Sequence, residues 1–554
     1  MAVVVAVGIA WYLLLPPPPV TLAPSPAGLT LPIRGAIHVH TRRSDGTGTV
    51  DEVAAAARRA GLQFVIFTDH GDGTRGSDTP VYRNGVLCID AVEISTNGGH
   101  VVALGLPQSE FPLAGEAGDV IEDIRRMGGM SIAAHPNSPR AELRWNDWNA
   151  PMDGVEWLNG DSQWRDEEWG TLARALFTYP FRGAATLATL LDRPDDLLNR
   201  WDALTASRPV VTLAAADAHA RVGTGGDPYG RSLSLHLPSY EQIFRTFSIS
   251  LPRVQLHGNA SDDAGVVVDA IRAGHLFSTI DAIASPAVFS FSATSGSHQA
   301  VMGDRLPLDG PVMLRIETNG RDGSSIRLLA EGKTVASGAP PLLEYTAPAK
   351  VAVYRVEVDV AGAPGVPPIP WLASNPIYVG TPVSSEGSSK AALLSDAVAV
   401  YSNGAATDWR IEKSVRSEGT IGTAPSLSGT QLLLRFGLGG TQSESPFVAA
   451  VIASNTDLAQ FKGVRFTART MRPMRLTFQL RAPGAGDRRW GRSIYVDDTA
   501  RTVTIAFDEM LPMGTATGRP SLDDVRDLLF VVDTVHAKQG SSGQVWLDEI
   551  RYVR

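Results

Sequence analysis

The chain of 554 residues contains one cysteine, Cys88. A single thiol excludes an intramolecular disulfide and a zinc site built from cysteines. Charged residues are also scarce, at 19%, and acidic ones prevail, so the net charge is −9. This balance argues against nonspecific binding to nucleic acid or to anionic lipid surfaces. It does not exclude a small anionic substrate, because a bound metal ion supplies local positive charge.

The N-terminus lacks the basic residues that begin an ordinary signal peptide. Ala2–Leu15 is an uncharged, almost wholly apolar run, and Pro16–Pro19 follow it. The run is shorter than the roughly 20 residues of a spanning helix. We expect residues 1–20 to be a signal peptide or a membrane anchor and residues 21–32 to be a Pro/Ser-rich linker. Either interpretation exports the protein, as a membrane-anchored, secreted or periplasmic chain. The alternative is a buried N-terminal strand or helix.

The length exceeds what one hydrophobic core supports, so several domains are expected. From residue 33 to residue 285, apolar runs that end in a polar residue alternate with helical stretches such as Asp51–Ala60 and Val120–Met127. Continuous apolar runs of this kind are typical of buried parallel strands. Thr49 and Glu52 form a capping-box pattern before the first helix. The alternation predicts an α/β barrel whose active residues lie at the carboxyl ends of the strands.

After residue 286 the pattern changes to short alternating strands separated by turn signals, as in Val312–Thr318. Residues 286–380 are predicted to form a small antiparallel β-sandwich, and residues 381–390 a linker. Residues 391–554 are predicted to form a jelly-roll-like β-sandwich that resembles carbohydrate-binding domains. Gln479–Arg481 and Trp490 are candidates for a sugar-binding face there. The alternative is an ordinary interaction or stability domain.

Histidine and carboxylate side chains collect in the first domain, mostly at the ends of apolar runs. They are His38, His40, Asp45, His70, Glu93, His100, His135, Asp217 and His219. Imidazole and carboxylate are the ligands that hold Zn, Mn or Fe, so the sequence predicts a multinuclear metal site. His38 and His40 lie two apart on a predicted strand and are expected to face the same side. Metals a few ångströms apart can share a carboxylate and activate a water for hydrolysis.

These residues occur as an ordered series of motifs: His38-Val39-His40, Ser44-Asp45-Gly46, Thr68-Asp69-His70, Glu93 with His100, His135-Pro136 and Asp217-Ala218-His219. In this order they resemble the PHP superfamily (polymerase and histidinol phosphatase domains) over residues 33–285. The resemblance implies a distorted (β/α)7 barrel in which the nine residues hold two or three divalent metals and Glu93 bridges two of them. Asp45 stands where many members have a histidine, which leaves the number of bound metals at two or three. The whole layout is similar to the carbaryl-hydrolase-like branch of the superfamily.

The first functional hypothesis is a metal-dependent hydrolase that uses a water activated by two or three divalent ions of Zn, Mn or Fe. On superfamily grounds it is a phosphoesterase for a phosphomonoester or nucleotide-type substrate. The branch similarity implies the alternative, hydrolysis of a carbamate, carboxylic ester or amide. A further alternative is a surface glycan-binding protein with structural metals. Structural metal sites are closed by protein ligands and leave no free coordination position. We expect a small-molecule or glycan-linked substrate and an N-terminal membrane tether, whereas the oligomeric state is not determined by the sequence.

Two further residues are candidates for catalysis. Asp69 is either a ligand or the partner of a ligating histidine. Arg221 either clamps an anionic group or belongs to a structural ion pair. Glu156, at the end of an apolar run, is expected to have a structural hydrogen-bonding role. The segment with five tryptophans from Trp145 to Trp169 predicts either an aromatic lid over the site or the packing of an irregular insertion.

Overall fold

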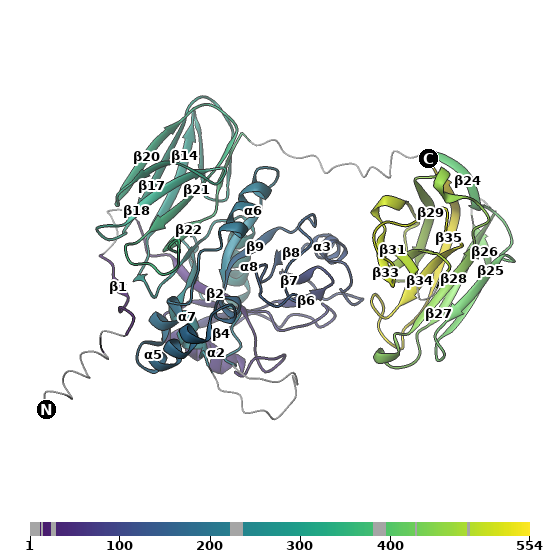
Figure 1. Cartoon of the computed structure of the whole chain (residues 1–554), viewed down its shortest axis with the longest axis horizontal. Helices are drawn as coiled ribbons and strands as arrows, with labels where there is room; N and C mark the ends of the chain where they lie inside the picture. Colours follow the sequence, from purple (N-terminus) through teal and green to yellow (C-terminus); the bar gives the residue numbers. More distant parts are fainter. Residues whose placement is uncertain are drawn as a thin grey trace. The chain divides into compact units, whose positions relative to one another are not determined.

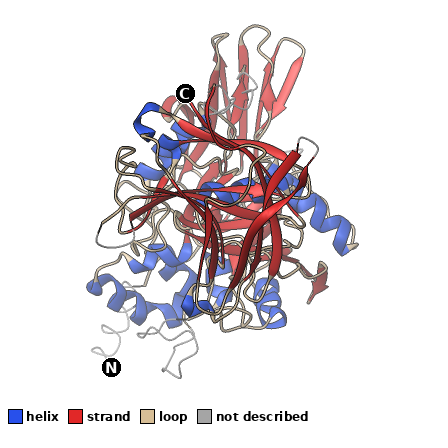
Figure 2. Ribbon diagram, turned by 90° about the vertical axis from the view of Figure 1, so that its right-hand side faces the viewer, coloured by secondary structure: helices blue, strands red, loops and turns tan. Residues whose placement is uncertain are grey.

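The computed structural model describes residues 12, 15–23, 29–221, 237–380, 395–426, 429–484 and 488–554. The chain forms two compact units (Figure 1). One comprises Met1–Asp72, Gly76–Pro107 and Ile124–Ser384, and the other comprises Gly73–Arg75, Gln108–Asp123 and Ser385–Arg554. Strands prevail over helices in the described chain (Figure 2). The predicted linker at residues 381–390 and most of the predicted signal peptide or anchor lie outside the described residues.

The first region contains the strands that the apolar runs predict. They are β2 (Ile33–Val39), β3 (Phe64–Phe67), β4 (Val81–Arg83), β5 (Val86–Asp90), β6 (Val92–Thr96), β7 (Gly99–Leu104), β8 (Met130–Ala133), β9 (Gly154–Asn159), β10 (Val211–Ala215), β11 (Ser248–Leu251) and β12 (Phe277–Thr279). One sheet has the order β10-β9-β8-β7-β6, and the other contains β12-β11-β2-β3-β5-β4. Isolated parallel bridges join Val39 to Ala218 and His70 to Glu93, and so link the two sheets near the predicted ligands.

Strand directions in this region are mixed. The pairs β2–β3, β3–β5, β8–β9 and β9–β10 are parallel, whereas β7 runs antiparallel to both β6 and β8. Helices do not follow every strand: none lies between the parallel strands β8 and β9, whereas α3 lies between the antiparallel strands β7 and β8. The α/β character is therefore present, and the regular seven-fold barrel stays a prediction.

Seven helices are described between these strands. They are α2 (Val50–Arg59), α3 (Ala117–Arg126), α4 (Gly160–Arg165), α5 (Trp169–Ala188), α6 (Asp195–Thr205), α7 (Tyr240–Thr246) and α8 (Ala260–Arg272). The predicted capping box of α2 is confirmed, since the Glu52 carboxylate accepts from Thr49 N at 2.8 Å and Thr49 Oγ1 accepts from Glu52 N at 3.2 Å. Among the described helices, none has both the length and the apolar character needed to cross a bilayer.

The second region is a β-sandwich that shares a sheet with the first. Its strands are β14 (Phe289–Ser295), β15 (His298–Val301), β16 (Arg305–Leu306), β17 (Val312–Thr318), β18 (Ser325–Ala330), β19 (Lys333–Gly338), β20 (Leu342–Ala347), β21 (Ala352–Asp359), β22 (Leu372–Ser374) and β23 (Ile377–Val379). Because β22 pairs with β12, hydrogen bonds cross the predicted boundary at residue 286. In addition, β1 (Val20–Thr21) pairs with β13 (Ala284–Ser285), so part of the predicted linker is a strand.

Residues 395–554 form the predicted antiparallel sandwich. Its strands are β24 (Asp396–Tyr401), β25 (Trp409–Lys413), β26 (Glu418–Ser426), β27 (Gly429–Gly437), β28 (Phe447–Ala453), β29 (Gly463–Thr470), β30 (Met474–Arg481), β31 (Arg488–Val496), β32 (Arg501–Ala506), β33 (Leu511–Gly514), β34 (Asp527–Asp533) and β35 (Ser542–Val553). One sheet has the order β26-β27-β35-β29-β32, with β24 also on β35, and the other has the order β25-β28-β34-β30-β31-β33. Their inner faces share one apolar core.

The sugar-binding face suggested by Trp490 and Gln479 is not available to a ligand. Trp490 is 2% exposed, belongs to the apolar core, and donates from Nε1 to the carbonyl of Gly518 at 2.9 Å. Gln479 is 1% exposed. The prediction for this indole is wrong because the register of β31 turns it into the sandwich.

Candidate metal centre

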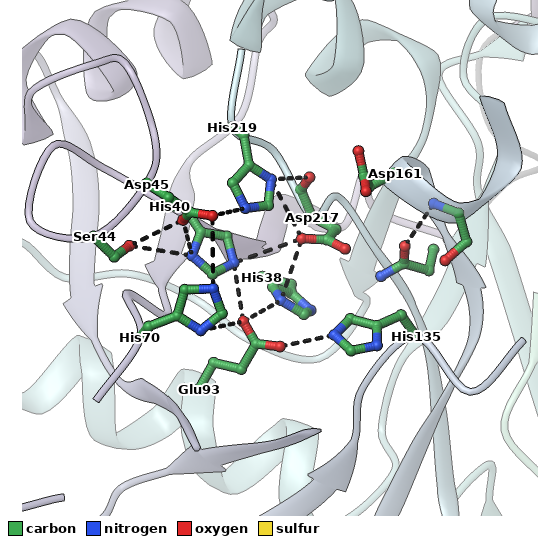
Figure 3. A network of polar contacts seen from close by, with 12 residues as sticks. His38, His40, Ser44, Asp45, His70, Glu93, His135, Asp161, Asp217 and His219 are labelled. Carbon is green, nitrogen blue, oxygen red and sulfur yellow. Dashed lines mark hydrogen bonds and ion pairs between the residues drawn. The ribbon is translucent and has the colours of Figure 1, made fainter. Parts of the chain in front are cut away.

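Strand ends bring the predicted ligands together in the first unit (Figure 3). His38 lies on β2, Glu93 on β6 and His100 on β7. The others lie in the loops that directly follow β2, β3, β8 and β10: His40, Asp45, His70, His135, Asp217 and His219. The side chains form overlapping groups whose ligand atoms lie within 4.8 Å of one another: His40, Asp45, His70 and His219; His38, His135 and Asp217; His38, His40 and Glu93; and His70, Glu93 and His100. These groups can hold metal ions.

A bulge, and not a regular strand, brings His38 and His40 together. The pairing of β2 with β3 shifts register between Ile37 and Val39, and His38 has a φ of 65°. A bulge re-aims the side chain that it carries. His40 lies one residue beyond Val39, where β2 ends. The rings of His38 and His40 do lie together, with centroids 5.2 Å apart. The prediction that a regular strand places them on the same side is wrong.

Backbone strain collects at the same place. Besides His38, His135 has a φ of 31° and Asp217 a φ of 44°. Each left-handed residue other than glycine costs about 1–3 kcal/mol and persists only where its surroundings over-determine it. Strain at three predicted ligands therefore favours a functional role for this cluster.

The inner part of the cluster has the dimensions of a metal coordination shell. His38 Nε2 and His40 Nε2 are buried without a hydrogen-bond partner. His38 Nε2 lies 3.2 Å from Glu93 Oε2 and 3.4 Å from Asp217 Oδ1, and the corresponding distances from His40 Nε2 are 3.1 and 3.5 Å. Ligand atoms about 2.0–2.1 Å from a tetrahedral metal are about 3.3 Å from one another. His38, His40 and Glu93 therefore form one group that can hold a metal ion, and Asp217 belongs to a second such group with His38 and His135.

Glu93 presents its two carboxylate oxygens to different imidazoles. Oε1 lies 2.7 Å from His100 Nδ1 and 2.8 Å from His135 Nε2. Oε2 lies 3.3 Å from His70 Nδ1, in addition to its contacts with His38 and His40. Glu93 is 1% exposed. This is the arrangement in which one carboxylate can bridge two metals.

The outer part of the cluster is open. Asp45 Oδ2 lies 3.2 Å from His219 Nε2 and 3.7 Å from His70 Nε2, and Asp45 Oδ1 lies 3.4 Å from His40 Nδ1. The side chains of Asp45 and His70 are 34% and 36% exposed, whereas that of His40 is fully buried. Water and small solutes can therefore reach the cluster from the side of Asp45 and His70.

Charges within the cluster stabilise one another. Burial alone would raise the pKa of the carboxyls of Glu93 and Asp217, but the surrounding histidines hold both pKa values far below their usual range. Burial would lower the pKa of His219, but its contacts with Asp45 and Asp217 raise that pKa to about 9. The buried carboxylates thus require positive charge around them, from protonated imidazoles or from divalent cations.

Glu156 connects two of the predicted ligands. Its Oε1 lies 2.5 Å from His38 Nδ1, and its Oε2 accepts from the backbone N–H of His135 at 2.7 Å. Asn159 Nδ2 donates to the same Oε2 at 2.8 Å. A carboxylate on the second ring nitrogen fixes the orientation and tautomer of a ligating histidine. The hydrogen-bonding role expected for Glu156 is thus directed at the cluster itself.

The two candidate catalytic residues lie in different settings. Asp69 accepts hydrogen bonds from Thr41 N, Thr41 Oγ1 and Ser44 Oγ, each at 2.7 Å, and is 4% exposed. It therefore orders the loop that carries Asp45. Arg221 is half-buried and precedes the undescribed segment 222–236. Its expected role as an anion clamp stays a prediction.

The tryptophan-rich segment is not a single lid. Trp145 and Trp157 are each 1% exposed, and Trp157 lies on β9. Trp164 lies on α4, and Trp169 begins α5. Of the two interpretations, packing holds for the two buried indoles. The polar residues of the segment interrupt the apolar pattern, so its strand and helices could not be predicted from the sequence.

No family model matches the chain. An uncharacterized protein of Methanocaldococcus jannaschii is 30% identical over 142 residues, which are 23% of this chain and 82% of that protein. Among solved structures, a family 11 carbohydrate-binding module from Clostridium thermocellum, in complex with a β-1,3-1,4-mixed-linked tetrasaccharide, is 14% identical with a TM-score of 0.24, covering 28% of this chain and 94% of that one. A family 30 carbohydrate-binding module is 12% identical with a TM-score of 0.23, covering 28% and 86%. At these TM-scores, neither likeness bears on fold or function.

Proposed function

The chain belongs, through its matched segment, to the family of the uncharacterized Methanocaldococcus jannaschii protein, and we propose from the geometry of its cluster that it is a metal-dependent hydrolase of the PHP type. The proposed reaction is hydrolysis of a phosphoester, with a phosphomonoester or nucleotide-type substrate. The order of the ligand motifs supports the superfamily assignment, and with it the distorted (β/α)7 barrel.

One observation supports this proposal most strongly. His38 Nε2 and His40 Nε2 are buried without a hydrogen-bond partner, and each lies 3.1–3.5 Å from both Glu93 Oε2 and Asp217 Oδ1. Unpaired buried polar atoms are costly in a folded protein. A divalent cation beside the two nitrogens would remove this cost, and it would balance the charge of the buried carboxylates.

The open side favours catalysis over a structural metal site. Structural sites are closed by protein ligands, whereas catalytic sites leave positions for water and substrate. Divalent ions bound there would acidify a water and polarise the scissile group. The protein's own contribution is to orient His38 through Glu156, to fix the loop of Asp45 through Asp69, and to admit substrate beside His70.

The test compares hydrolysis of 4-nitrophenyl phosphate with that of a 4-nitrophenyl carboxylic ester and a carbamate, using Zn- or Mn-loaded protein. His135→Ala removes a ligand, and His298→Ala is the matched control because His298 is exposed on β15. Phosphate release that His135→Ala abolishes and His298→Ala keeps supports the proposal. Cleavage of only the ester or the carbamate would replace it with carbonyl hydrolysis. No metal-dependent rate on any substrate would favour a glycan-binding protein with structural metals.

A further inference from the structure

A cavity of about 410 Å³ lies beside the strand ends that carry the metal cluster, within one compact unit. It is enclosed by α2, the strands β3, β4 and β5, the loop that follows β2 and the segment that precedes β4. Its apolar wall is formed by Val50, Phe67, Pro80, Val81 and Cys88. Small-molecule sites occupy roughly 300–1,000 Å³ and are lined mainly by apolar side chains. The cavity therefore has the size and the lining of a small-molecule site.

The pairing of β4 with β5 directs Val81 into this cavity. Val81 lies opposite Cys88 in that antiparallel pair, and side chains directly opposite one another project from the same face of a sheet. Phe67 of β3 and Cys88 of β5 are 2% and 5% exposed, whereas Val81 is 39% exposed. Phe67 and Cys88 thus form the inner wall, and Val81 stands at the rim, where a larger side chain would fill the cavity without entering the core.

Charged side chains around the cavity are held in ion pairs. Arg43 Nη1 lies 3.2 Å from Asp90 Oδ1, and Arg43 Nη2 contacts Asp78. Arg83 Nη1 lies 2.9 Å from Asp51 Oδ1. The guanidiniums are thus matched by carboxylates, which repel an anionic ligand. The lining therefore suits an uncharged organic group and not a phosphate.

The same two segments build the cavity and the open side of the metal cluster. Arg43 lies two residues before Asp45 in one loop, and Phe67 ends β3 three residues before His70. Asp45 and His70, which are 34% and 36% exposed, lie 3.7 Å apart on one side of the cluster (Figure 3). An extended chain advances about 3.3 Å per residue, so the cavity begins within roughly 10 Å of these two ligands. One small molecule can therefore reach both the cluster and the cavity.

We propose that the cavity holds the organic group of the substrate while its phosphate lies at the metal cluster, so that the substrates are phosphomonoesters of aromatic or branched apolar alcohols. This inference rests on the proposed hydrolase function and narrows its substrate class. A sugar phosphate is disfavoured, because its hydroxyls would lose hydrogen bonds to water against the apolar wall. In the reaction, a water oxygen bonds to phosphorus as the P–O bond to the organic group breaks. One proton of the water passes to the departing oxygen, which yields the free alcohol and inorganic phosphate.

Two primary alkyl phosphates test this, since their leaving groups differ little in basicity: 3-phenylpropyl phosphate and glycerol 1-phosphate. With the Zn- or Mn-loaded full chain, kcat/KM is expected to favour the phenylpropyl ester at least about tenfold. Val81→Trp fills the cavity from its rim and is expected to remove most of this preference. Val335→Trp is the matched control and is expected to keep it, because Val335 lies on β19 and is 38% exposed, against 39% for Val81. Thr79→Trp, at an exposed lining position, is a second filling variant in case Val81→Trp does not fold.

The outcomes separate the cavity from the hydrolase. Phosphoester hydrolysis without a preference for the phenylpropyl ester, or a preference that survives in a folded filling variant, would overturn the inference and leave the hydrolase in place. If the native chain hydrolyses no phosphoester, the proposed function fails, and equilibrium dialysis of 3-phenylpropanol then decides on the cavity. Saturable binding that Val81→Trp weakens at least about tenfold would support a site for an apolar group. No binding, or equal binding by both proteins, would overturn it.

Discussion

At the scale of single residues, Glu156 orients two of the candidate ligands, His38 and His135. It is 1% exposed, and its carboxylate contacts the ring of His38 and the backbone of His135. Both of these residues have a left-handed backbone. A shared anchor explains how such strained residues keep one orientation.

Glu156→Gln is expected to lower metal affinity about 10–100-fold, because the neutral amide no longer polarises the ring of His38. Competition with a chromophoric chelator measures the affinity, and circular dichroism verifies the fold. Glu418→Gln, on the exposed surface of β26, is the control. Unchanged affinity in Glu156→Gln would show that the Glu156 contact is only structural.

The identities of the candidate ligands could be predicted from the sequence because the spacing of His and Asp relative to apolar runs is local information. The partner of His38 could not, because Glu156 is 118 residues away in the chain. The bulge at His38 could not be predicted from the sequence either, because a register shift depends on the pairing of β2 with β3. Trp490 was misjudged for a similar reason, as only the register of β31 decides which side chains turn inward.

At the scale of elements, the carboxylate of Asp69 helps to hold the loop from Thr41 to Asp45. Asp69 accepts three hydrogen bonds from Thr41 and Ser44. Asp45 belongs to the group with His40, His70 and His219. The order of this loop therefore decides whether that group is complete.

Asp69→Ala is expected to reduce bound metal by about one ion per chain, by releasing Asp45 from its group while leaving Glu93 and Asp217 in place. Metal analysis after gel filtration measures the loss. Asp408→Ala, at an exposed position of the C-terminal sandwich, is expected to have no effect. Full metal content in Asp69→Ala would contradict this role of Asp69.

Strand β21 carries a buried charge cluster that fastens the second region to the first. Glu357 is 0% exposed and contacts Arg193 at 2.6 Å, Arg355 at 2.5 Å and Arg327 at 2.5 Å. Burial would raise the pKa of Glu357, but these guanidiniums lower it from 4.5 to about 2. Because the folded pKa is depressed, its contribution to stability is present above about pH 5 and is lost as the pH falls from 4.5 towards 2.

Glu357→Gln is expected to cost about 3–5 kcal/mol of unfolding free energy at pH 7, because it leaves buried arginines uncompensated. Denaturant titrations of both proteins over a pH series measure the difference. It is expected to shrink as the pH falls from 4.5 towards 2, because Glu357 of the unfolded chain takes up a proton in this range before Glu357 of the folded chain does. A difference that is constant with pH would contradict the ionic origin of the effect.

At the scale of the whole molecule, all the candidate ligands belong to one of the two compact units. The unit that contains Ser385–Arg554 includes none of them. The strands and the antiparallel sandwich of that unit could be predicted from alternation and turns. The continuity of the first two regions could not, because the pairing of β12 with β22 joins segments almost 100 residues apart, and local patterns do not record it.

Metal removal is therefore expected to lower the stability of one unit only. A ligand at 1,000 times its dissociation constant stabilises the folded state by about 4 kcal/mol. In differential scanning calorimetry, a chelator is expected to lower the midpoint of one transition and to leave the other in place. Equal shifts of both transitions would contradict the confinement of the metals to one unit.

The most direct test of the account is the metal content of the purified chain, measured by mass spectrometry after loading with Zn or Mn and removal of free metal. The native protein is expected to hold two or three ions, and Glu93→Gln to lose the ions that the two oxygens of Glu93 face. The exposed-surface variant Glu418→Gln is expected to keep them. Less than one ion per native chain, or an unchanged content in Glu93→Gln, would contradict the multinuclear centre on which the proposed hydrolase rests.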